Sequence, residues 1–575
     1  METTCSAADR SGTTLVINLT RFGDLLQCQP LIEDLHCQGQ AVHLVCLDNF
    51  SSAQPLLRHV ERTWPLPGAR LMADMDKDWR IATALLLEFA RAVRSEARPD
   101  CVVNLTTTLP ARLLTGLLAG GQADGQAEIR GFCLDAHGFG QNRGIWSTFL
   151  NSGATNRLSA PFNLADMFRM VGAPHTPAAA DVQPRQRLAD PPGEALVAAD
   201  ALLAEAPPET CGFVAMQLGA SEARRQWPAH FFAEVGDRLW RDRKHCPVLL
   251  GSPAERPLAE AYAQAAQGHW VDAVGKTNLT QLAALLRRSK LLFTNDTGTM
   301  HLAAGLGVPC LAIFLATAQP CDTGPYLPGC CCLEPALPCH PCPFGRPCPN
   351  NLACVTHISP RSVESLALSW LDAGRWDAAP LDLVGREARV WLTEQDDKGF
   401  MTVRCLTEHA AEDRSLWLAQ QRIFWRQILD ELDSAARPAA AEQGSSDTRQ
   451  PEENAPSSSA HGTAHADDSA SAFSAGFSQR MAASLEQAAQ LFEMLTQQGQ
   501  LLGKSPKAGQ LFLRNCERLQ TVFDACPELR SLGAFWRELR QERGDRLDDL
   551  LELTAQLGAH FVIWRHKFTD GTSFA

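Results

Sequence analysis

The chain has 575 residues, of which 45% are hydrophobic and 20% charged, and its formal net charge at pH 7 is -13. That length predicts two to four globular domains, and the negative charge argues against a general nucleic-acid or membrane-surface binder. No apolar run is long enough to span a bilayer and the first residues do not resemble a signal peptide, so we expect a cytoplasmic protein whose 20 cysteines are free thiols or metal ligands.

The first part of the chain alternates apolar runs of strand length with segments of helical periodicity. Strands are predicted at residues 14–19, 41–47 and 101–105, and helices at residues 24–36 and 81–93. Strands that alternate with helices indicate a parallel sheet covered by helices on both faces. Residues 120–165 are rich in Gly, Asn and Phe and are predicted to form loops, and the whole domain is expected to span residues 12–175.

A second series of strands and helices follows a Pro-, Ala- and Asp-rich stretch at residues 173–193, which we interpret as a linker. Strands are predicted at residues 213–218, 247–251, 291–294 and 310–314. Helices are predicted at residues 229–240, 257–266 and 279–288 and after Thr297. Two consecutive units of this kind, the second at residues 195–372, predict a ligand site in the cleft between them.

The remaining chain has a different composition. Two apolar runs flank a turn at residues 396–399, and with the amphipathic segment that follows they predict a small hairpin-and-helix extension over residues 380–435. Residues 436–474 are rich in Ala, Ser, Gly, Glu and Asp and are expected to be a disordered linker. The last segment, residues 475–575, is predicted to be a helical tail that self-associates or docks a partner.

The loop after the first predicted strand, RFGD at residues 21–24, places a glycine and an aspartate at a helix start. Gly23 lets the backbone approach a ligand closely, and the Asp24 carboxylate could accept a proton from a substrate hydroxyl. The alternative is that Asp24 only caps its helix.

The segment QLGASEARRQWP at residues 217–228 lies at another strand end, where parallel sheets bind their ligands. Ser221 could donate a hydrogen bond to a phosphate oxygen, and Arg224 and Arg225 could neutralise the charge of the phosphate. The alternative is a solvated pair of arginines in a loop.

The loop GSPAER at residues 251–256 follows a further strand and carries Glu255. A carboxylate at this place can accept both hydroxyls of a ribose, as an acidic residue does in dinucleotide folds. The alternative is that Glu255 only favours the N-terminus of the following helix.

The segment TNDTGTMH at residues 294–301 joins an apolar run to a helix start. Backbone N–H groups and the positive end of a helix dipole at such a turn suit a phosphate. The alternative is a well-capped helix with Asp296 or Thr297 as its cap.

Taken together, the order of these four motifs resembles the ADP-heptose:lipopolysaccharide heptosyltransferase family, glycosyltransferase family 9, over residues 12–372. The resemblance implies an α/β protein of the GT-B fold, with two Rossmann-like domains that face each other across a cleft, followed here by a mostly helical C-terminal extension. It also implies inverting transfer that needs no metal, with the acceptor held by the N-terminal domain and the nucleotide sugar by the C-terminal domain.

The resemblance assigns deprotonation of the acceptor to Asp24, in a loop with Arg21 and Gly23. The donor-binding residues that it implies are, in chain order, Ser221, Arg225, Glu255, Leu279, Asp296, Thr297, Gly298 and His301. The first two would hold the phosphates, the next two the ribose and the adenine, and the last four would form the diphosphate turn. Each preorganised donor to the charge of a leaving group is typically worth about 3–4 kcal/mol.

Three positions differ from the pattern of the family. Arg225 replaces the usual lysine, Thr299 stands where proline is common, and Leu315 replaces a glycine after the following strand. These differences bear on the identity of the donor more than on the fold.

A Pro-rich loop over residues 330–354 contains seven cysteines, and the last four of them follow the spacing C-x2-C-x5-C-x5-C. These four are Cys339, Cys342, Cys348 and Cys354. Four thiols at this spacing could close a tetrahedral structural site for zinc or iron. The alternative is a set of free cysteines in a loop.

We therefore expect a cytoplasmic inverting glycosyltransferase that transfers heptose from ADP-heptose to an inner-core sugar of lipopolysaccharide, with no cofactor required for transfer. It would act at the inner face of the inner membrane as a peripheral protein at most, without binding nucleic acid. One alternative is transfer of heptose or another nucleotide-linked sugar onto a protein, such as an autotransporter or flagellin. Another is a catalytically silent GT-B protein that binds or assembles partners.

Overall fold

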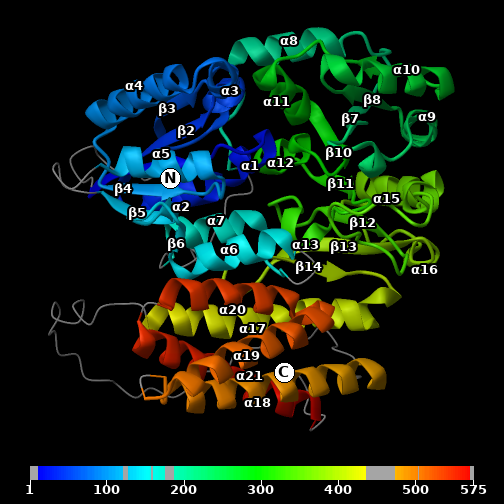
Figure 1. Cartoon of the computed structure of the whole chain (residues 1–575). Helices are drawn as coiled ribbons and strands as arrows, with labels where there is room; N and C mark the ends of the chain where they lie inside the picture. The colour runs from blue at the N-terminus through cyan, green and yellow to red at the C-terminus, as the bar shows by residue number, and fades with distance from the viewer. Residues whose placement is uncertain are drawn as a thin grey trace, which may run out of the picture. The chain divides into compact units, whose positions relative to one another are not determined.

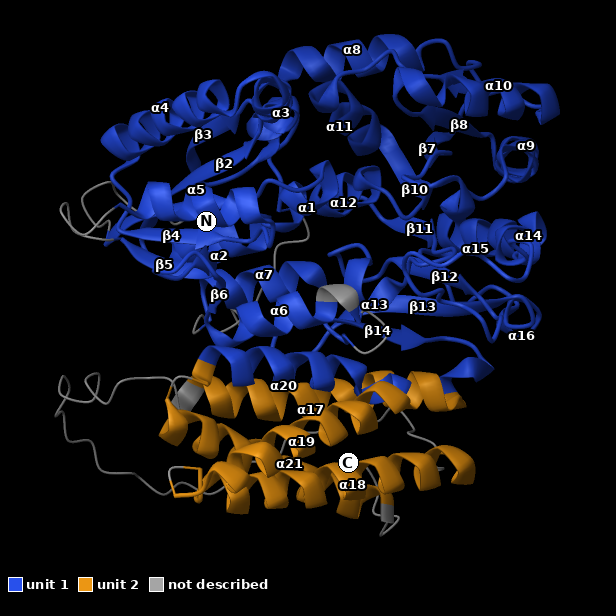
Figure 2. Ribbon diagram, in the orientation of Figure 1, with its two compact units in different colours: residues 1–410, 527–542 blue, residues 411–526, 543–575 orange. Residues whose placement is uncertain are grey.

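The computed structural model describes residues 11–120, 127–156, 160–174, 187–435, 473–502, 504–544 and 546–569 (Figure 1). Most of the predicted linkers at 173–193 and 436–474 therefore lies outside the described residues. The chain forms two compact units (Figure 2). The first comprises residues 1–410 with 527–542, and the second comprises residues 411–526 with 543–575.

The N-terminal domain of the first unit contains a six-stranded sheet in the order β3-β2-β1-β4-β5-β6. Its first five strands in this order are parallel, and only β6 runs antiparallel to its neighbour. Buried aliphatic residues such as Ile17, Val45 and Val102 form its core. The strands are β1 (Gly12–Ile17), β2 (Gln40–Leu47), β3 (Val60–Leu66), β4 (Cys101–Asn104), β5 (Glu128–Leu134) and β6 (Gly140–Arg143).

Helices connect these strands, and two of them, α1 and α2, take the place of one predicted helix. The helices are α1 (Phe22–Gln27), α2 (Gln29–Cys37), η2 (Asp48–Leu56), α3 (Gly68–Lys77), α4 (Trp79–Ala97), α5 (Leu109–Ala119), α6 (Ile145–Thr155) and α7 (Leu164–Gly172). The single helix predicted at residues 24–36 is divided into α1 and α2 at Cys28. Pro30, in the first turn of α2, has no N–H for a continuous ladder of helical hydrogen bonds, which accounts for the break.

The prediction of loops over residues 120–165 was wrong, because this segment contains β5, β6 and α6. One of its glycines is required by a strand rather than by a loop. Gly131 has a φ of 85° inside β5, where a Cβ atom would overlap the backbone of Asn104. Pairing with β4 therefore overrides the weak strand propensity of the local sequence.

The C-terminal domain of the first unit contains an eight-stranded sheet in the order β14-β13-β12-β11-β10-β7-β8-β9. The six strands from β12 to β9 are parallel, and the hairpin β13–β14 adds two antiparallel strands at one edge. The strands are β7 (Gly212–Gln217), β8 (His245–Leu250), β9 (Val271–Asp272), β10 (Ser289–Asn295), β11 (Cys310–Ile313), β12 (Cys331–Pro335), β13 (Ala388–Gln395) and β14 (Met401–Cys405). The hairpin predicted within residues 380–435 is thus an edge of this sheet.

Helices cover this second sheet, and the predicted helix at residues 279–288 is reproduced as α11. The helices are α8 (Gly193–Leu203), η4 (Ala223–Arg225), α9 (Ala229–Arg243), η5 (Pro253–Glu255), α10 (Arg256–Ala265), α11 (Leu279–Arg288), α12 (Gly298–Gly305), α13 (Pro320–Thr323), α14 (Cys354–His357), α15 (Pro360–Ala373), α16 (Leu381–Val384) and η6 (Glu408–Ala411). Trp227 is buried at the centre of the core between α9 and β10, in edge-to-face contact with Phe232 and Phe293. The α/β architecture of two Rossmann-like domains, which is that of the GT-B fold, is confirmed.

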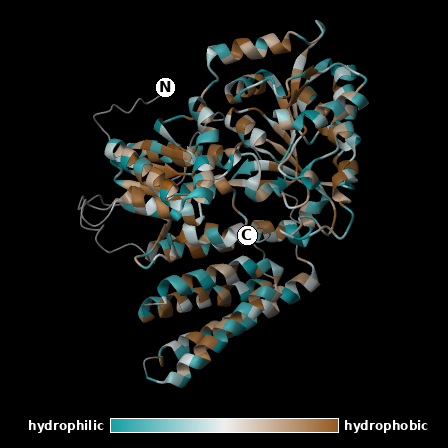
Figure 3. Cartoon of the chain, turned by 45° about the horizontal axis from the view of Figure 1, so that its top comes forward, coloured by the Kyte–Doolittle hydropathy of each residue, from teal (hydrophilic) through white to brown (hydrophobic). Residues whose placement is uncertain are grey.

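The second unit is helical, as predicted for the C-terminal extension. It consists of α17 (Asp413–Ala435), α18 (Ala475–Gly499), α19 (Pro506–Ala525) and α21 (Leu547–Thr569). Helix α18 packs along both α19 and α21, with Leu485, Phe523 and Phe561 buried between the helices. Brown and teal residues alternate along these helices in Figure 3, as expected for amphipathic helices. Among the described residues, no helix combines the length and apolarity needed to cross a membrane.

One part of the predicted tail belongs to the first unit instead. The short η8 (Pro527–Leu529) and helix α20 (Arg530–Arg543), except for its last residue, cluster with the two Rossmann-like domains. Helix α20 buries Phe535, Trp536 and Leu539. The helical tail is therefore not one separate module.

Candidate functional site

The two Rossmann-like domains meet where α1 and α12 cross closely, and a glycine on each helix permits this approach. A Cβ atom at Gly23 would lie 2.9 Å from Cδ2 of His301 and 3.3 Å from the Cα atom of Gly298. A Cβ atom at Gly298 would lie 2.8 Å from Cδ1 of Phe22. Larger residues at either position would push the helices apart. This crossing brings Asp24 of α1 next to His301 of α12.

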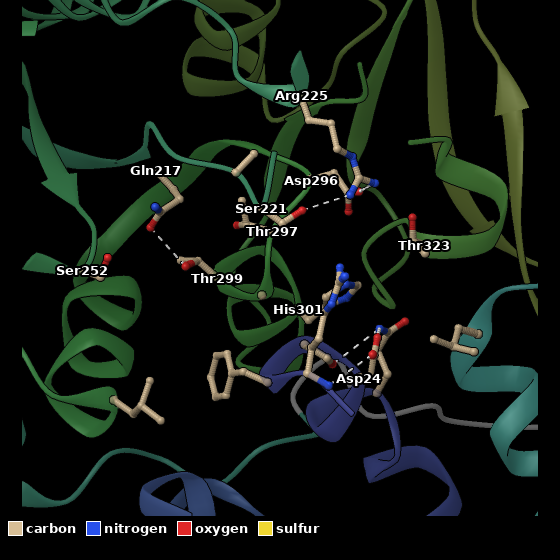
Figure 4. A pocket seen from close by; sticks show the side chains of 18 of the residues that line it. Asp24, Gln217, Ser221, Arg225, Ser252, Asp296, Thr297, Thr299, His301 and Thr323 are labelled. Carbon is tan, nitrogen blue, oxygen red and sulfur yellow. Dashed lines mark hydrogen bonds and ion pairs between the residues drawn. The ribbon is translucent and has the colours of Figure 1, made fainter. Parts of the chain in front are cut away.

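A cavity of about 760 Å³ opens beside this crossing and is lined by both domains (Figure 4). All eleven residues predicted to bind donor or acceptor line it, although they come from five separate segments of the chain. They are Arg21, Gly23, Asp24, Ser221, Arg225, Glu255, Leu279, Asp296, Thr297, Gly298 and His301. The cavity lies at the carboxyl ends of parallel strands, the place where open α/β sheets bind their ligands.

The turn between β10 and α12 leaves the first N–H groups of the helix without a side-chain cap. Thr297 is the N-cap residue and has an extended backbone, but its side chain makes no capping hydrogen bond to the helix. The alternative of a helix capped by the Thr297 side chain is therefore wrong. Uncapped N–H groups and the positive end of the helix dipole at the cavity form an environment suited to an anion.

The Asp296 carboxylate pairs with Arg225 and orients its guanidinium. The Arg225 guanidinium donates from Nη2 to Oδ2 of Asp296 at 2.7 Å and from Nη1 to the Ser221 hydroxyl at 3.2 Å (Figure 4). The side chains of Arg225 and Asp296 are only 8% and 10% exposed, so the pair is held in a low-dielectric environment. This contact explains an aspartate beside a predicted phosphate site: it fixes the planar guanidinium in one orientation.

Asn295 fixes the position of the loop that contains Arg225. Its side-chain amide donates to the carbonyl of Leu218 at 2.8 Å and accepts from the backbone N–H of Trp227 at 3.0 Å. Asn295 is fully buried at the end of β10. The loop after β7 and the turn after β10 are therefore joined on the protein side of the cavity.

Glu255 is held by three hydrogen bonds from the protein. Its Oε2 accepts from the backbone N–H of Ser252 at 2.6 Å and from the Ser252 hydroxyl at 2.8 Å, and its Oε1 accepts from Nε2 of Gln217 at 2.9 Å. A carboxylate offers about four lone-pair sites, so one site on Oε1 is left for a ligand. In this arrangement Glu255 has room for one further hydrogen bond, whereas the predicted contact with both hydroxyls of a ribose needs two.

Gln217 connects Glu255 to the turn after β10. Its side-chain carbonyl accepts from the Thr299 hydroxyl at 3.1 Å, as the dashed line in Figure 4 marks. This bond turns the amide so that its NH2 group faces Glu255. Thr299, one of the positions at which the chain departs from the family pattern, therefore has a specific partner.

Asp24 faces the cavity and also takes part in a capping box at the start of α1. Its Oδ2 accepts from the backbone N–H of Arg21 at 3.4 Å, and its Oδ1 accepts from Nε2 of Gln27 at 3.5 Å. Both distances are at the long limit for a hydrogen bond, so the carboxylate keeps accepting capacity for a ligand. The capping and ligand interpretations of Asp24 are compatible in this geometry.

His301 is buried beside Asp24 and uncharged near neutral pH. Burial lowers its pKa to about 4, and the negative charge of Asp24 opposes this effect only in part. Its ring stands against the position of Gly23. His301 therefore fills the crossing between the domains with a neutral ring, which can bond to a ligand without adding a positive charge.

The part of the cavity formed by the N-terminal domain is mainly apolar. Leu150 and Gly153 from α6 and Leu164 and Met167 from α7 line it. On the other side, Leu279 lines the cavity at the start of α11, where a flat apolar group would be sheltered.

Several lining residues were not predicted. They are Gln217, Ser252, Thr277, Thr299, Asp322 and Thr323. Ser252 was readable, because the sequence S-x-x-E at residues 252–255 is a capping-box pattern. Asp322 lies on α13, shortly after β11, so its position after a strand was the available signal.

Cys339, Cys342, Cys348 and Cys354 lie near one another but are not drawn together as metal ligands. Among the described residues, no three Cys, His, Asp or Glu side chains lie close enough together to hold a metal ion. Cys354 is buried in α14, whereas Cys339 is exposed. Burial raises the pKa of Cys342 and of Cys354, and the other thiols of the group act in the same direction. Cys348 accepts hydrogen bonds from the backbone N–H groups of Asn350 and Leu352, each at 3.4 Å, as metal-bound sulfur also does, so the zinc or iron site stays a prediction.

The fold and the cavity define a class of protein with two Rossmann-like domains and a ligand site between them. Residues 183–353, less than half of the chain, match the model of glycosyltransferase family 9 (heptosyltransferase).

Curated relatives match shorter stretches. Lipooligosaccharide heptosyltransferase 2 of Haemophilus influenzae is 30% identical over 98 residues, which cover 16% of this chain and 28% of the relative. Lipopolysaccharide heptosyltransferase 1 of Pseudomonas aeruginosa is 31% identical over 124 residues, which cover 22% of this chain and 34% of the relative. The chain thus spans about a third or less of the length of these relatives.

Solved structures align more widely at lower identity. The glycosyl transferase family 9 protein of Veillonella parvula is 18% identical, with a TM-score of 0.43 over 55% of this chain and 84% of its own. Escherichia coli heptosyltransferase WaaC with ADP is 20% identical, with a TM-score of 0.39 over 55% of this chain and 90% of its own.

Proposed function

We propose that this chain is an inverting glycosyltransferase that transfers heptose from ADP-heptose to an inner-core sugar of lipopolysaccharide. The observation that carries this proposal is the convergence of Asp24 and the 296–301 turn in one cavity, although they belong to different domains. The match of residues 183–353 to the model of glycosyltransferase family 9 supports it. The proposal includes a cytoplasmic location at the inner face of the inner membrane, and association through the helical second unit.

In the proposed reaction the acceptor hydroxyl attacks the anomeric carbon of the donor sugar while Asp24 takes the proton of that hydroxyl. A bond forms between the acceptor oxygen and the anomeric carbon, and the bond from that carbon to the diphosphate breaks. Attack from the face opposite the diphosphate inverts the anomeric centre. The negative charge that develops on the leaving diphosphate is stabilised by the Arg225 guanidinium and by the N–H groups at the start of α12.

The ribose and adenine of the donor have their own places in this proposal. Glu255 accepts one ribose hydroxyl, and Leu279 lies against the adenine ring. The neutral ring of His301 shields the space between Asp24 and the diphosphate from water without competing with Arg225 for the negative charge.

A panel of donors tests this function. The full-length protein is mixed with ADP-heptose, UDP-glucose, GDP-mannose or a CDP-sugar, and its thermal unfolding is followed, because a ligand that binds the native state raises the unfolding temperature by mass action. Only ADP-heptose is expected to raise it clearly, and release of ADP is expected when heptose-free lipopolysaccharide is added. A clear preference for a uridine or guanosine donor would refute the heptose assignment.

A protein acceptor is the second candidate, and the apolar wall of the N-terminal domain favours it. Leu150, Leu164 and Met167 suit a peptide segment better than they suit a phosphorylated sugar chain. With ADP-heptose as donor, transfer to a surface-protein substrate but not to lipopolysaccharide would select this alternative. Absence of transfer to both, with unchanged nucleotide binding, would select a catalytically silent binding protein.

A further inference from the structure

Helix α20 comes from the C-terminal region of the chain but packs on the N-terminal Rossmann-like domain within the first unit. Its partner there is the segment formed by β6 and α6. Phe535 of α20 and Phe149 of α6 are in edge-to-face contact, with ring centroids 6.5 Å apart. Phe149 in turn contacts Trp146 and Phe162, so α20 extends an aromatic cluster beneath α6.

Two carboxylates of α20 bind this segment directly. Glu538 accepts from the side-chain amides of Asn142 at 3.1 Å and of Asn151 at 2.9 Å. Glu542 accepts from the backbone N–H of Asn142 at 3.1 Å and from the Thr148 hydroxyl at 3.2 Å. Four hydrogen bonds thus reach α20 from residues that lie nearly 400 positions earlier in the chain.

The contact is anchored on the far side by Arg112. Its guanidinium donates to Oδ1 of Asn142 at 3.0 Å, and also to the backbone carbonyls of Thr107, Cys133 and Gln141. Asn142 is therefore fixed between Arg112 and the two glutamates. Because Asn142 directly precedes the turn into α6, this arrangement fixes the start of α6.

Helix α6 also forms the wall of the cavity. Leu150 and Gly153 line the cavity from α6, while Thr148 and Asn151 of the same helix bind α20. One helix therefore both binds α20, through residues 148 and 151, and lines the cavity, through residues 150 and 153. A shift of α6 by a fraction of its diameter would change the shape of the cavity on the side opposite Arg225.

We propose that Glu538 and Glu542 of α20 are positioning residues that hold α6 in place as the acceptor-side wall of the cavity. This proposal rests on the proposed function, because it takes the N-terminal side of the cavity as the acceptor side. It gives part of the C-terminal region a role in the transfer site, in place of a role in association alone.

The test compares three variants of the full-length protein, with ADP-heptose and heptose-free lipopolysaccharide as probes. The double variant Glu538→Ala with Glu542→Ala removes all four hydrogen bonds. The double variant Glu538→Gln with Glu542→Gln keeps an oxygen acceptor at both positions. The control variant Gln541→Ala changes an exposed residue of the same helix. The double alanine variant is expected to raise KM for lipopolysaccharide by about tenfold, while kcat and the Kd for ADP stay within about twofold. The double glutamine variant and Gln541→Ala are expected to match the wild type.

An unchanged KM in the double alanine variant would overturn the proposal. So would a parallel loss of ADP binding, because that result indicates a general structural role. If the double alanine variant does not fold, Asn151→Ala removes one of the same bonds from the α6 side and is expected to raise KM for lipopolysaccharide without affecting ADP binding.

A second measurement separates failure of this proposal from failure of the proposed function. If the wild type binds ADP but transfers nothing to lipopolysaccharide, the proposed acceptor is wrong, and hydrogen exchange of the α6 amides then decides the positioning role. Faster exchange over residues 145–155 in the double alanine variant, restored in the double glutamine variant, supports that role. Equal exchange in all variants refutes it.

Discussion

At the scale of single residues, the cavity is defined by polar groups whose hydrogen bonds are already partly used by the protein. Asp296 accepts a hydrogen bond from Arg225, and Glu255 accepts hydrogen bonds from Ser252 and Gln217. These hydrogen bonds fix the orientation of both side chains before a ligand binds, which is the basis of electrostatic preorganisation. They also limit how many ligand groups each side chain can accept.

This limit at Glu255 predicts selective recognition of one ribose hydroxyl. Because a single lone-pair site on its Oε1 remains free, only one of the two hydroxyls of ADP is expected to contribute to affinity. Calorimetry with 2′-deoxy-ADP and 3′-deoxy-ADP should show that one analogue binds about tenfold more weakly than ADP and that the other binds equally well. Equal losses for both analogues would show that Glu255 holds both hydroxyls.

Glu542 predicts a dependence of stability on pH. Burial raises its pKa from the ordinary value of 4.5 to about 7, and the neighbouring Glu538 acts in the same direction, against the Asn142 and Thr148 hydrogen bonds. A raised folded-state pKa gives stability that is fully present below pH 4.5 and is lost as the pH rises through 7.

Glu542→Gln should therefore be more stable than the wild type at pH 8, by on the order of 2 kcal/mol, and similar to it at pH 4.5. Thermal unfolding at the two pH values measures this difference. A stabilisation that is the same at both pH values would show that the titration of Glu542 is not its cause.

At the scale of secondary-structure elements, the crossing of α1 and α12 is the most constrained contact near the cavity. Gly23→Ala would place a Cβ atom 2.9 Å from His301 and 3.3 Å from the Cα atom of Gly298, so the two helices must separate. We expect ADP affinity to change little, because the donor residues lie in the C-terminal domain, and transfer to fall by at least about tenfold, because Asp24 moves away from the donor.

The matched control for this variant is Gly116→Ala in α5. A Cβ atom at Gly116 has no neighbour within 4 Å, and alanine in a helix is typically favoured over glycine by about 0.5–1 kcal/mol. Gly116→Ala should keep full transfer with equal or higher stability. If Gly23→Ala also kept full transfer, the close crossing would have no part in the reaction.

The elements themselves were predictable where local signals and tertiary context agree. Helix α11 was predicted with its observed ends, and in the structure Asn278 and Gln281 form a capping box at its start. The strands β5 and β6 were missed, because their glycines read as loop residues when only the local sequence is considered. Helix α20 was predicted as helical, but its place in the first unit depends on contacts with residues 142–151, which no local pattern reveals.

The residues that line the candidate site could be predicted from the sequence, but most hydrogen bonds between them could not. Four strand-end motifs contain ten of the eleven predicted lining residues, because parallel strands direct their carboxyl ends to one edge. The eleventh, Leu279, was implied by the family resemblance alone. The hydrogen bonds of Gln217 and Thr299 and the use of the Glu255 lone pairs depend on side-chain geometry across three loops. The metal site indicated by the cysteine spacing stays a prediction, because among the described residues no three ligand side chains lie close enough together to hold an ion.

At the scale of the whole molecule, a buried polar network joins the two Rossmann-like domains. Asp166 of α7 accepts from the Tyr326 hydroxyl at 2.6 Å and from the backbone N–H of Met401 at 2.7 Å, and both partners belong to the C-terminal domain. Arg169 pairs with Asp166 at 3.3 Å and with Asp34 at 2.7 Å. The two domains are therefore joined by charges and hydrogen bonds that are shielded from solvent.

Removing the central carboxylate of this network should be costly. Asp166→Ala leaves the buried guanidinium of Arg169 with one partner fewer and the Tyr326 hydroxyl without this acceptor, and such losses typically cost about 3–5 kcal/mol. Thermal unfolding should show a markedly lower midpoint than for the wild type. A midpoint within about one degree of the wild type would contradict the importance of this network, since 1 kcal/mol shifts the midpoint by about 2–4 °C in a domain of this size.

The role of Asp24 is the central claim of this account, and one comparison tests it most directly. Transfer of heptose to heptose-free lipopolysaccharide and the Kd for ADP are measured for the wild type and for Asp24→Asn, which keeps the shape of the side chain but cannot take a proton. The account predicts that transfer falls by about 100-fold or more, as for removal of a general base, while the Kd for ADP stays within about twofold. Transfer at the rate of the wild type would contradict it.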